Sequence, residues 1–145
     1  MKKIAVAIFA LASLLLFVLL ARSTALGLPP APDFSINCTQ DTLRTRPGSA
    51  PVRFLLSLVV NNGYQGTVHL ACVTLNPHLT CEVTPPSLRL GADSEIPFVV
   101  TVWADPGTKP SAGYPLIVNA KGEPANPRSE SPSSNQTVHL VVSGQ

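Results

Sequence analysis

Three cysteines are the residues of this chain best suited to covalent or redox chemistry: Cys38, Cys72 and Cys81. A catalytic thiol needs a histidine that is itself oriented by an acidic group, and the sequence indicates no such pair near any of the three. In an oxidising compartment two of them can instead form a disulfide. The state of Cys38 is left open among three possibilities: a buried free thiol, a link to another molecule, or a disulfide with one of the other two cysteines.

Two histidines, His69 and His139, are the next candidates, because imidazole is a common zinc ligand. Both alternate out of phase with the apolar residues around them, so we expect both side chains to face solvent. The strand around Tyr114 should lie between their two strands, which separates the histidines by about 9 to 10 Å at the usual strand spacing. His78 lies in a loop without a partner motif. We therefore expect no metal site.

The carboxylates are too scattered to indicate an acid–base pair or a calcium loop. They are Asp33, Asp41, Glu82, Asp93, Glu95, Asp105, Glu123 and Glu130. The motifs of serine hydrolases, zinc peptidases and phosphate-binding loops do not occur in the sequence. We expect a protein that is not an enzyme and that has no catalytic residue and no cofactor.

The N-terminal segment has the pattern of an export signal. Lys2 and Lys3 precede an uncharged, mostly apolar run over residues 4–21, and small residues follow up to Ala25. We interpret residues 1–25 as a signal peptide. An uncleaved anchor in the inner membrane is the alternative, because the run of 18 residues reaches the lower limit of a spanning helix. In both cases the positive-inside rule predicts that the rest of the chain is periplasmic, on the cell surface or extracellular.

Removal of such a signal changes the charge of the chain. Lys2, Lys3 and Arg22 are three of the ten basic residues, so seven basic residues remain against eight acidic ones. The net charge then falls from +2 to −1, and the remaining residues contain no run of lysine or arginine. Nucleic acid is therefore not an expected partner. Contact with a membrane is expected only through the N-terminal segment, if that segment is not cleaved.

The elements that must position these residues are short strands. From Asp33 onward apolar and polar residues alternate, and clusters of Pro, Gly, Asn and Asp interrupt each run. Fifteen prolines argue against helices here. The predicted strands cover residues 34–38, 42–45, 52–60, 67–73, 80–84, 87–90, 96–102, 114–120 and 137–142. Residues 104–113 are expected to be a connection without internal structure.

This strand pattern predicts an all-β, immunoglobulin-like sandwich of two antiparallel sheets over residues 33–145. The signal or anchor helix and a proline-rich linker, residues 26–32, precede it. Each strand has one apolar face, and two facing sheets bury those faces against each other. Pro97 and Pro115 lack a backbone N–H, so we expect them at strand edges or bulges.

Several segments, in order, resemble an immunoglobulin-like repeat that occurs in many secreted bacterial proteins. The segments are residues 33–36 (DFSI), 47–49 (PGS), 62–72 (NGYQGTVHLAC), 79–85 (LTCEVTP) and 110–118 (PSAGYPLIV). The resemblance implies the sandwich fold and a disulfide between Cys72 and Cys81. It implies little about function, because members of this family are accessory modules and sandwich folds serve many unrelated roles.

Some apolar residues occupy strand positions whose side chains should point away from the core. Leu55 and Val59 alternate out of phase with the core residues of their strand, and Val99 and Trp103 do so on theirs. If those two strands pair, the four residues form one exposed apolar patch with Trp103 as its anchor, and such patches mark partner surfaces. The alternative is that the N-terminal tail, residues 28–32, or the strand twist covers them.

Two surfaces could therefore carry a function. The first is the patch of Leu55, Val59, Val99 and Trp103; the second is the insertion from Gly122 to Asn135, whose Pro- and Ser-rich composition predicts a mobile loop.

The leading hypothesis is an exported, non-catalytic module for protein–protein interaction or a structural role at the cell surface, with an unknown protein or a second copy as partner. The alternatives are a polysaccharide-binding module that uses Tyr64 and Trp103 as platforms, or a small metal-binding or hydrolytic protein.

Overall fold

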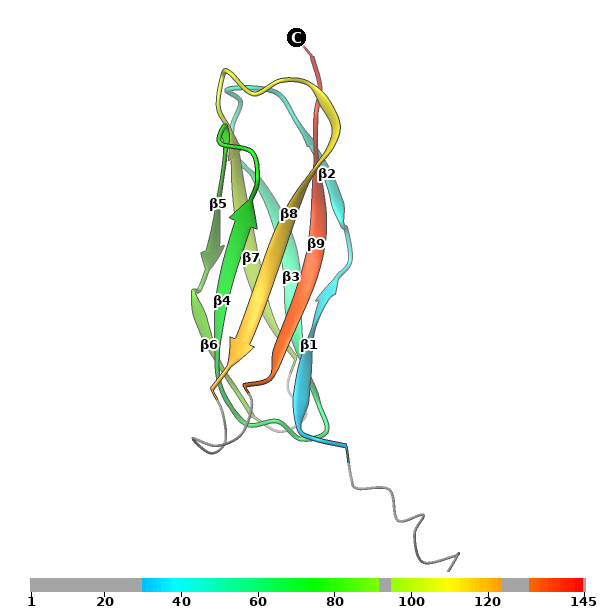
Figure 1. Ribbon diagram of the computed structural model, residues 1–145, viewed down its shortest axis with the longest axis vertical. Helices are drawn as coiled ribbons and strands as arrows, with labels where there is room; N and C mark the ends of the chain where they lie inside the picture. Colours follow the sequence, from blue (N-terminus) through cyan, green and yellow to red (C-terminus); the bar gives the residue numbers. More distant parts are fainter. Residues whose placement is uncertain (1–29, 92–94, 124–130, 145) are drawn as a thin grey trace, which may run out of the picture. The chain divides into compact units, whose positions relative to one another are not determined.

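A computed structural model describes residues 30–91, 95–123 and 131–144 (Figure 1). The predicted signal or anchor, residues 1–25, lies outside the described residues, as do residues 26–29 of the predicted linker. In the part of the chain that is described, no helix is long and apolar enough to cross a membrane.

The described residues form nine strands and no helix. The strands are β1 (Asp33–Cys38), β2 (Thr42–Thr45), β3 (Val52–Asn61), β4 (Gly66–Thr74), β5 (Leu79–Thr84), β6 (Ser87–Leu90), β7 (Glu95–Ala104), β8 (Ser111–Gly122) and β9 (Ser133–Val142). They assemble into a four-stranded sheet A, in the order β1-β3-β7-β5, and a five-stranded sheet B, in the order β2-β9-β8-β4-β6. This arrangement confirms the predicted two-sheet sandwich.

One strand pair departs from the antiparallel arrangement of the rest. β2 pairs with β9 in parallel, with Thr42 opposite His139 and Thr45 opposite Val142. The cause is the short connection after Cys38. Residues 39–41 carry the chain from sheet A to sheet B without reversing its direction, so β2 runs the same way as β9 (Figure 1).

The alternation of apolar residues decides which face of each strand is buried. On β3, Phe54, Leu56 and Leu58 are buried, while the residues between them are more exposed. On sheet B, Val68, Leu70, Leu116, Val118, Val138 and Leu140 supply the opposing layer. Full burial of one such side chain contributes about 1.5 to 3 kcal/mol, so the parity of each strand is strongly fixed.

The ends of β8 and β9 differ from the prediction. β8 begins at Ser111, within the connection predicted to lack structure, and its pairing with β9 is irregular between Ser111 and Tyr114.

The insertion predicted between the last two strands is also shorter than expected. Gly122 ends β8, and the Gly122 N–H donates to the Pro132 carbonyl oxygen at 2.8 Å. Ser133–Val142 is a strand because its backbone can pair with β8 even where its outward side chains are polar. Residues 124–130 lie outside the described part.

Both prolines lie where a missing N–H costs least, as predicted. Pro97 lies opposite Ser57 of β3, and the pairing of β5 with β7 has already ended at Thr84 and Val99. Pro115 lies one residue before the pairing of β8 with β4 begins at Leu116.

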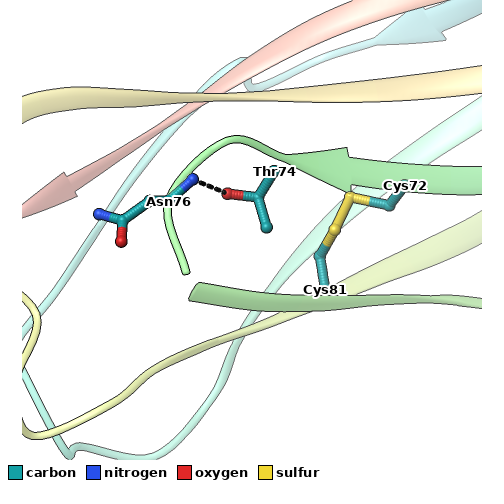
Figure 2. Close-up of a disulfide and its surroundings, with 4 residues drawn as sticks. All are labelled: Cys72, Thr74, Asn76 and Cys81. Carbon is teal, nitrogen blue, oxygen red and sulfur yellow. Dashed lines mark hydrogen bonds between the residues drawn. A yellow bond between two sulfur atoms is a disulfide. The ribbon is translucent and has the colours of Figure 1, made fainter. Parts of the chain in front are cut away.

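A disulfide joins the two sheets. Cys72 on β4 and Cys81 on β5 are bonded with their Cα atoms 5.9 Å apart (Figure 2), within the normal range for a disulfide. The pairing implied by the family resemblance is confirmed. Cys38 is a half-buried free thiol, and its sulfur donates to the Gln40 carbonyl oxygen at 3.1 Å.

Candidate functional site on the outer face of sheet A

The outer face of sheet A carries all four residues of the predicted patch. Leu55 and Val59 lie on β3, Val99 and Trp103 lie on β7, and these strands pair along most of their length. Their neighbours in sequence, such as Phe54 and Phe98, point into the core. The inward and outward positions assigned from the sequence on these two strands therefore agree with the structure.

Leu55 and Val99 are direct cross-strand neighbours, whereas the other two residues are not. Val59 lies opposite Glu95, and Trp103 lies opposite Thr80 of β5. Val59 lies four positions along β3 from Leu55, and Trp103 lies four positions along β7 from Val99. That spacing corresponds to about 13 Å.

Polar side chains occupy the intervening positions. The Ser57 hydroxyl donates to a carboxylate oxygen of Glu95 at 2.7 Å, between Leu55 and Val59. On the other side, Thr101 lies in register with Arg53 and Glu82, between Val99 and Trp103.

The structure therefore narrows the predicted patch to a centre formed by Leu55, Val99 and the exposed Pro97. Leu55 has 61% of its surface exposed, whereas Val59, Val99 and Trp103 are half-buried. A shallow hollow of about 200 Å³ adjoins Leu55, at the point where β1 leaves β3. Its lining residues are Asn37, Thr39, Leu55, Leu56, Ser57, Glu95 and Pro97. Pockets for drug-sized ligands are usually larger, about 300 to 1,000 Å³. The geometry suits one inserted side chain of a protein better than an enclosed small molecule.

Tyr64 cannot act as a platform for a sugar, which contradicts one of the alternatives drawn from the sequence. The side chain is only 4% exposed, and its ring packs edge-on against Phe34 at 5.0 Å. Its hydroxyl donates to the carbonyl oxygens of Thr67 and Glu123, each at 3.3 Å. Burial raises the pKa of Tyr64, the Glu123 carboxylate raises it further, and the hydrogen bond to the Glu123 backbone opposes both effects.

The histidines lie too far apart to share a metal ion. Their strands are separated by β8, as predicted, but His69 lies opposite Lys121 and His139 opposite Pro115. Six residues along β8 correspond to about 20 Å. His69 instead lies 3.5 Å from a carboxylate oxygen of Glu123, and both side chains are exposed. Among the described residues no group of three potential metal ligands occurs.

A second exposed apolar region was not predicted. Val73 at the end of β4 is 46% exposed, and Leu75 in the following loop is 81% exposed. The loop is shaped by its own polar groups, because the Asn76 N–H donates to the Thr74 hydroxyl at 3.2 Å (Figure 2) and the His78 N–H donates to the Asn76 side chain at 2.9 Å. In the sequence, only the alternation along the strand could have indicated this region. Val73 follows Cys72, which was predicted to point inward, so Val73 should point outward.

Comparisons with known proteins add information about the fold. A scan against protein families found no match, and a search of curated proteins found none. Among solved structures, a chain of the Salmonella enterica SafA pilin in complex with the SafB chaperone is 17% identical, with a TM-score of 0.50. That match covers 81% of this chain and 57% of the other. It supports the assignment of the sandwich to the immunoglobulin-like class.

Two further structures have slightly lower scores. PapD-like domain 7 of human CEP192 is 15% identical with a TM-score of 0.49, over 83% of this chain and 91% of that chain. The E. coli chaperone DraB is 20% identical with a TM-score of 0.46, over 75% of this chain and 54% of that chain. This chain spans little more than half the length of the chaperones DraB and SfaE. At such identities the likeness concerns the fold alone.

Proposed function

We propose that this chain is an exported, non-catalytic immunoglobulin-like domain that binds a protein partner through the outer face of sheet A. The observation that carries the proposal is the pairing of Leu55 with Val99 on that face, with Leu55 61% exposed. An exposed apolar centre within a polar surround is the usual composition of a protein-binding surface.

Polar groups around this centre favour a protein over a polysaccharide. Ser57, Glu95, Arg53 and Glu82 provide donors and charges of both signs around Leu55 and Val99. A polysaccharide site would depend on exposed aromatic rings, and Tyr64 is buried while Trp103 is half-buried.

Export, and membership of the secreted bacterial repeat family, are parts of the same proposal. The Lys2-Lys3 start, the apolar run and the small residues before Leu26 support export. The disulfide between Cys72 and Cys81 supports it independently, because structural disulfides persist mainly in oxidising compartments. The intact mass of the exported protein tests this part. A chain that begins near Leu26 and gains 2 Da on reduction is expected; a full-length chain in the membrane fraction indicates an anchor instead.

Paired leucine variants test the binding surface. Leu55→Ser removes the apolar centre of sheet A, whereas Leu75→Ser removes a more exposed leucine in the loop between β4 and β5. Chemical cross-linking in the native host and light scattering of the purified protein report a partner and self-association, respectively. We expect Leu55→Ser to abolish the complex and Leu75→Ser to leave it unchanged. A complex that survives Leu55→Ser in full excludes this face as the site.

A further inference from the structure

The first residues of β3 form an open strand edge. β1 pairs with β3 only as far as Cys38, which lies opposite Leu56, and the chain then crosses to β2 in sheet B. Residues 52–54 pair with β7 on one side, and among the described residues no strand pairs with them on the other. No loop hydrogen bond from elsewhere in the described ranges reaches their backbone either. Because the N–H and C=O groups of successive residues point to alternate edges, at least one of these residues has both groups unpaired.

A groove follows this open edge. A hollow of about 480 Å³ is lined by Thr39, Gln40, Leu43, Arg53, Phe54 and Leu55. A second hollow, of about 350 Å³, is lined by Arg44, Thr45, Arg46, Ser49, Ala50, Val52 and Ser143. The linings contain consecutive residues of both β2 and β3, so the two hollows lie along the same gap between these strands. We call them together the edge groove.

The edge groove is positively charged and has an apolar floor. Its described lining includes Arg44, Arg46 and Arg53 and contains no carboxylate. Within the described residues none of the three guanidinium groups forms an ion pair or a side-chain hydrogen bond. Leu43 and Val52, which pack against the core, form the floor.

We propose that the edge groove binds an extended, acidic segment of a partner protein as an additional strand on β3. Side chains directly opposite each other in a sheet share a face. A residue opposite Arg53 therefore faces outward beside the guanidinium group, whereas residues opposite Val52 and Phe54 face the floor. The register specifies an apolar–acidic–apolar pattern in the segment. This site adjoins the Leu55–Val99 surface and shares Arg53 and Leu55 with it. The proposal rests on the open edge of β3 and not on the function proposed above.

Titration with a peptide tests the proposal. The probe is acetyl-Thr-Thr-Val-Glu-Val-Thr-Thr-amide, whose blocked ends carry no charge, added to the ¹⁵N-labelled exported protein. We expect amide shifts confined to residues 39–46 and 52–55, and slower amide exchange within residues 52–54. An opposite-charge pair across strands is attractive, and a like-charge pair is repulsive by a similar amount. Arg53→Glu replaces attraction with repulsion, so it should weaken binding by about two- to thirtyfold.

Three controls separate strand addition from general charge attraction. Arg89→Glu changes an exposed arginine on β6, at the opposite edge of sheet B, and should leave the affinity unchanged. A peptide with lysine in place of glutamate, and one N-methylated at the glutamate and both valines, should each fail to bind. If no peptide binds, or if the N-methylated peptide binds equally well, the proposal is wrong. The arginines would then act only to protect an open edge from pairing.

Discussion

Gly122 lies so close to Tyr64 that a Cβ atom on residue 122 would come within 2.5 Å of the tyrosine hydroxyl oxygen. The same Cβ would lie 2.8 Å from the ring of Phe34, which itself packs against Tyr64. Gly66 is in a similar position, with its Cβ direction 2.8 Å from the Tyr64 hydroxyl. One buried tyrosine therefore determines which residues are tolerated at the ends of two neighbouring strands, β4 and β8.

Gly122→Ala should consequently destabilise the protein. The added methyl group collides with two buried aromatic side chains, and overpacking of this kind costs about 1 to 3 kcal/mol. Urea denaturation should show a lower midpoint with an unchanged slope. Gly107→Ala is the control, because its Cβ would meet only His78 at an ordinary 3.7 Å. Equal stability of the two variants would contradict the described packing around Tyr64.

Tyr64 should ionise at higher pH than a free tyrosine. Burial raises its pKa above 10.0, and the neighbouring Glu123 carboxylate adds to the effect. Absorbance at 295 nm, recorded for Tyr114→Phe, follows Tyr64 alone because the chain has two tyrosines. A midpoint at or below 10.0 would show that the Tyr64 hydroxyl is not buried as described.

The same shift makes stability depend on pH at the alkaline end. As pH rises past 10, the unfolded chain releases the tyrosine proton before the folded protein does, so the unfolded state is favoured. The contribution of Tyr64 to stability is therefore complete below pH 10 and is lost as pH rises through the folded pKa. In Tyr64→Phe this part of the alkaline decline should vanish, which thermal melts between pH 8 and pH 11 will measure.

Most of the fold could be predicted from the sequence, because turning the wrong face of a strand toward the core costs a large free energy. A one-residue error on β3 would exchange Phe54, Leu56 and Leu58 for residues of the outer face. Strand ends were less well predicted. Ser133 to Asn135 were predicted to belong to a polar loop, yet their backbone pairs with β8, and backbone pairing leaves little signal in side-chain composition.

The candidate site was predicted less completely than the fold. The sequence placed Leu55 and Val99 on one face, but it did not contain the register that makes them neighbours and sets Val59 and Trp103 apart. The burial of Tyr64 and the open edge of β3 were also missed. Both depend on contacts between segments distant in sequence, such as Phe34 with Tyr64, which no local pattern encodes.

Adjacent leucines on β3 provide a direct check of strand parity. Leu55 is 61% exposed and Leu56 is 2% exposed, although they are consecutive. Leu56→Ala should cost about 2 to 5 kcal/mol, since it leaves a cavity in the core, whereas Leu55→Ala should change stability by less than about 0.5 kcal/mol. The reverse order of stabilities would mean that β3 is shifted by one residue.

The disulfide should stabilise the sandwich measurably, because it ties an edge strand of sheet A to sheet B. The bond closes a loop between residues nine apart, for which the chain-entropy relation gives roughly 2 to 3 kcal/mol. The double variant Cys72→Ala, Cys81→Ala should therefore melt about 10 °C lower than the parent protein. Cys38→Ala is the matched control, since it removes a thiol that forms no disulfide, and it should shift the melting temperature much less. A larger loss from Cys38→Ala than from the double variant would indicate that Cys38, and not only the Cys72–Cys81 pair, takes part in a stabilising link.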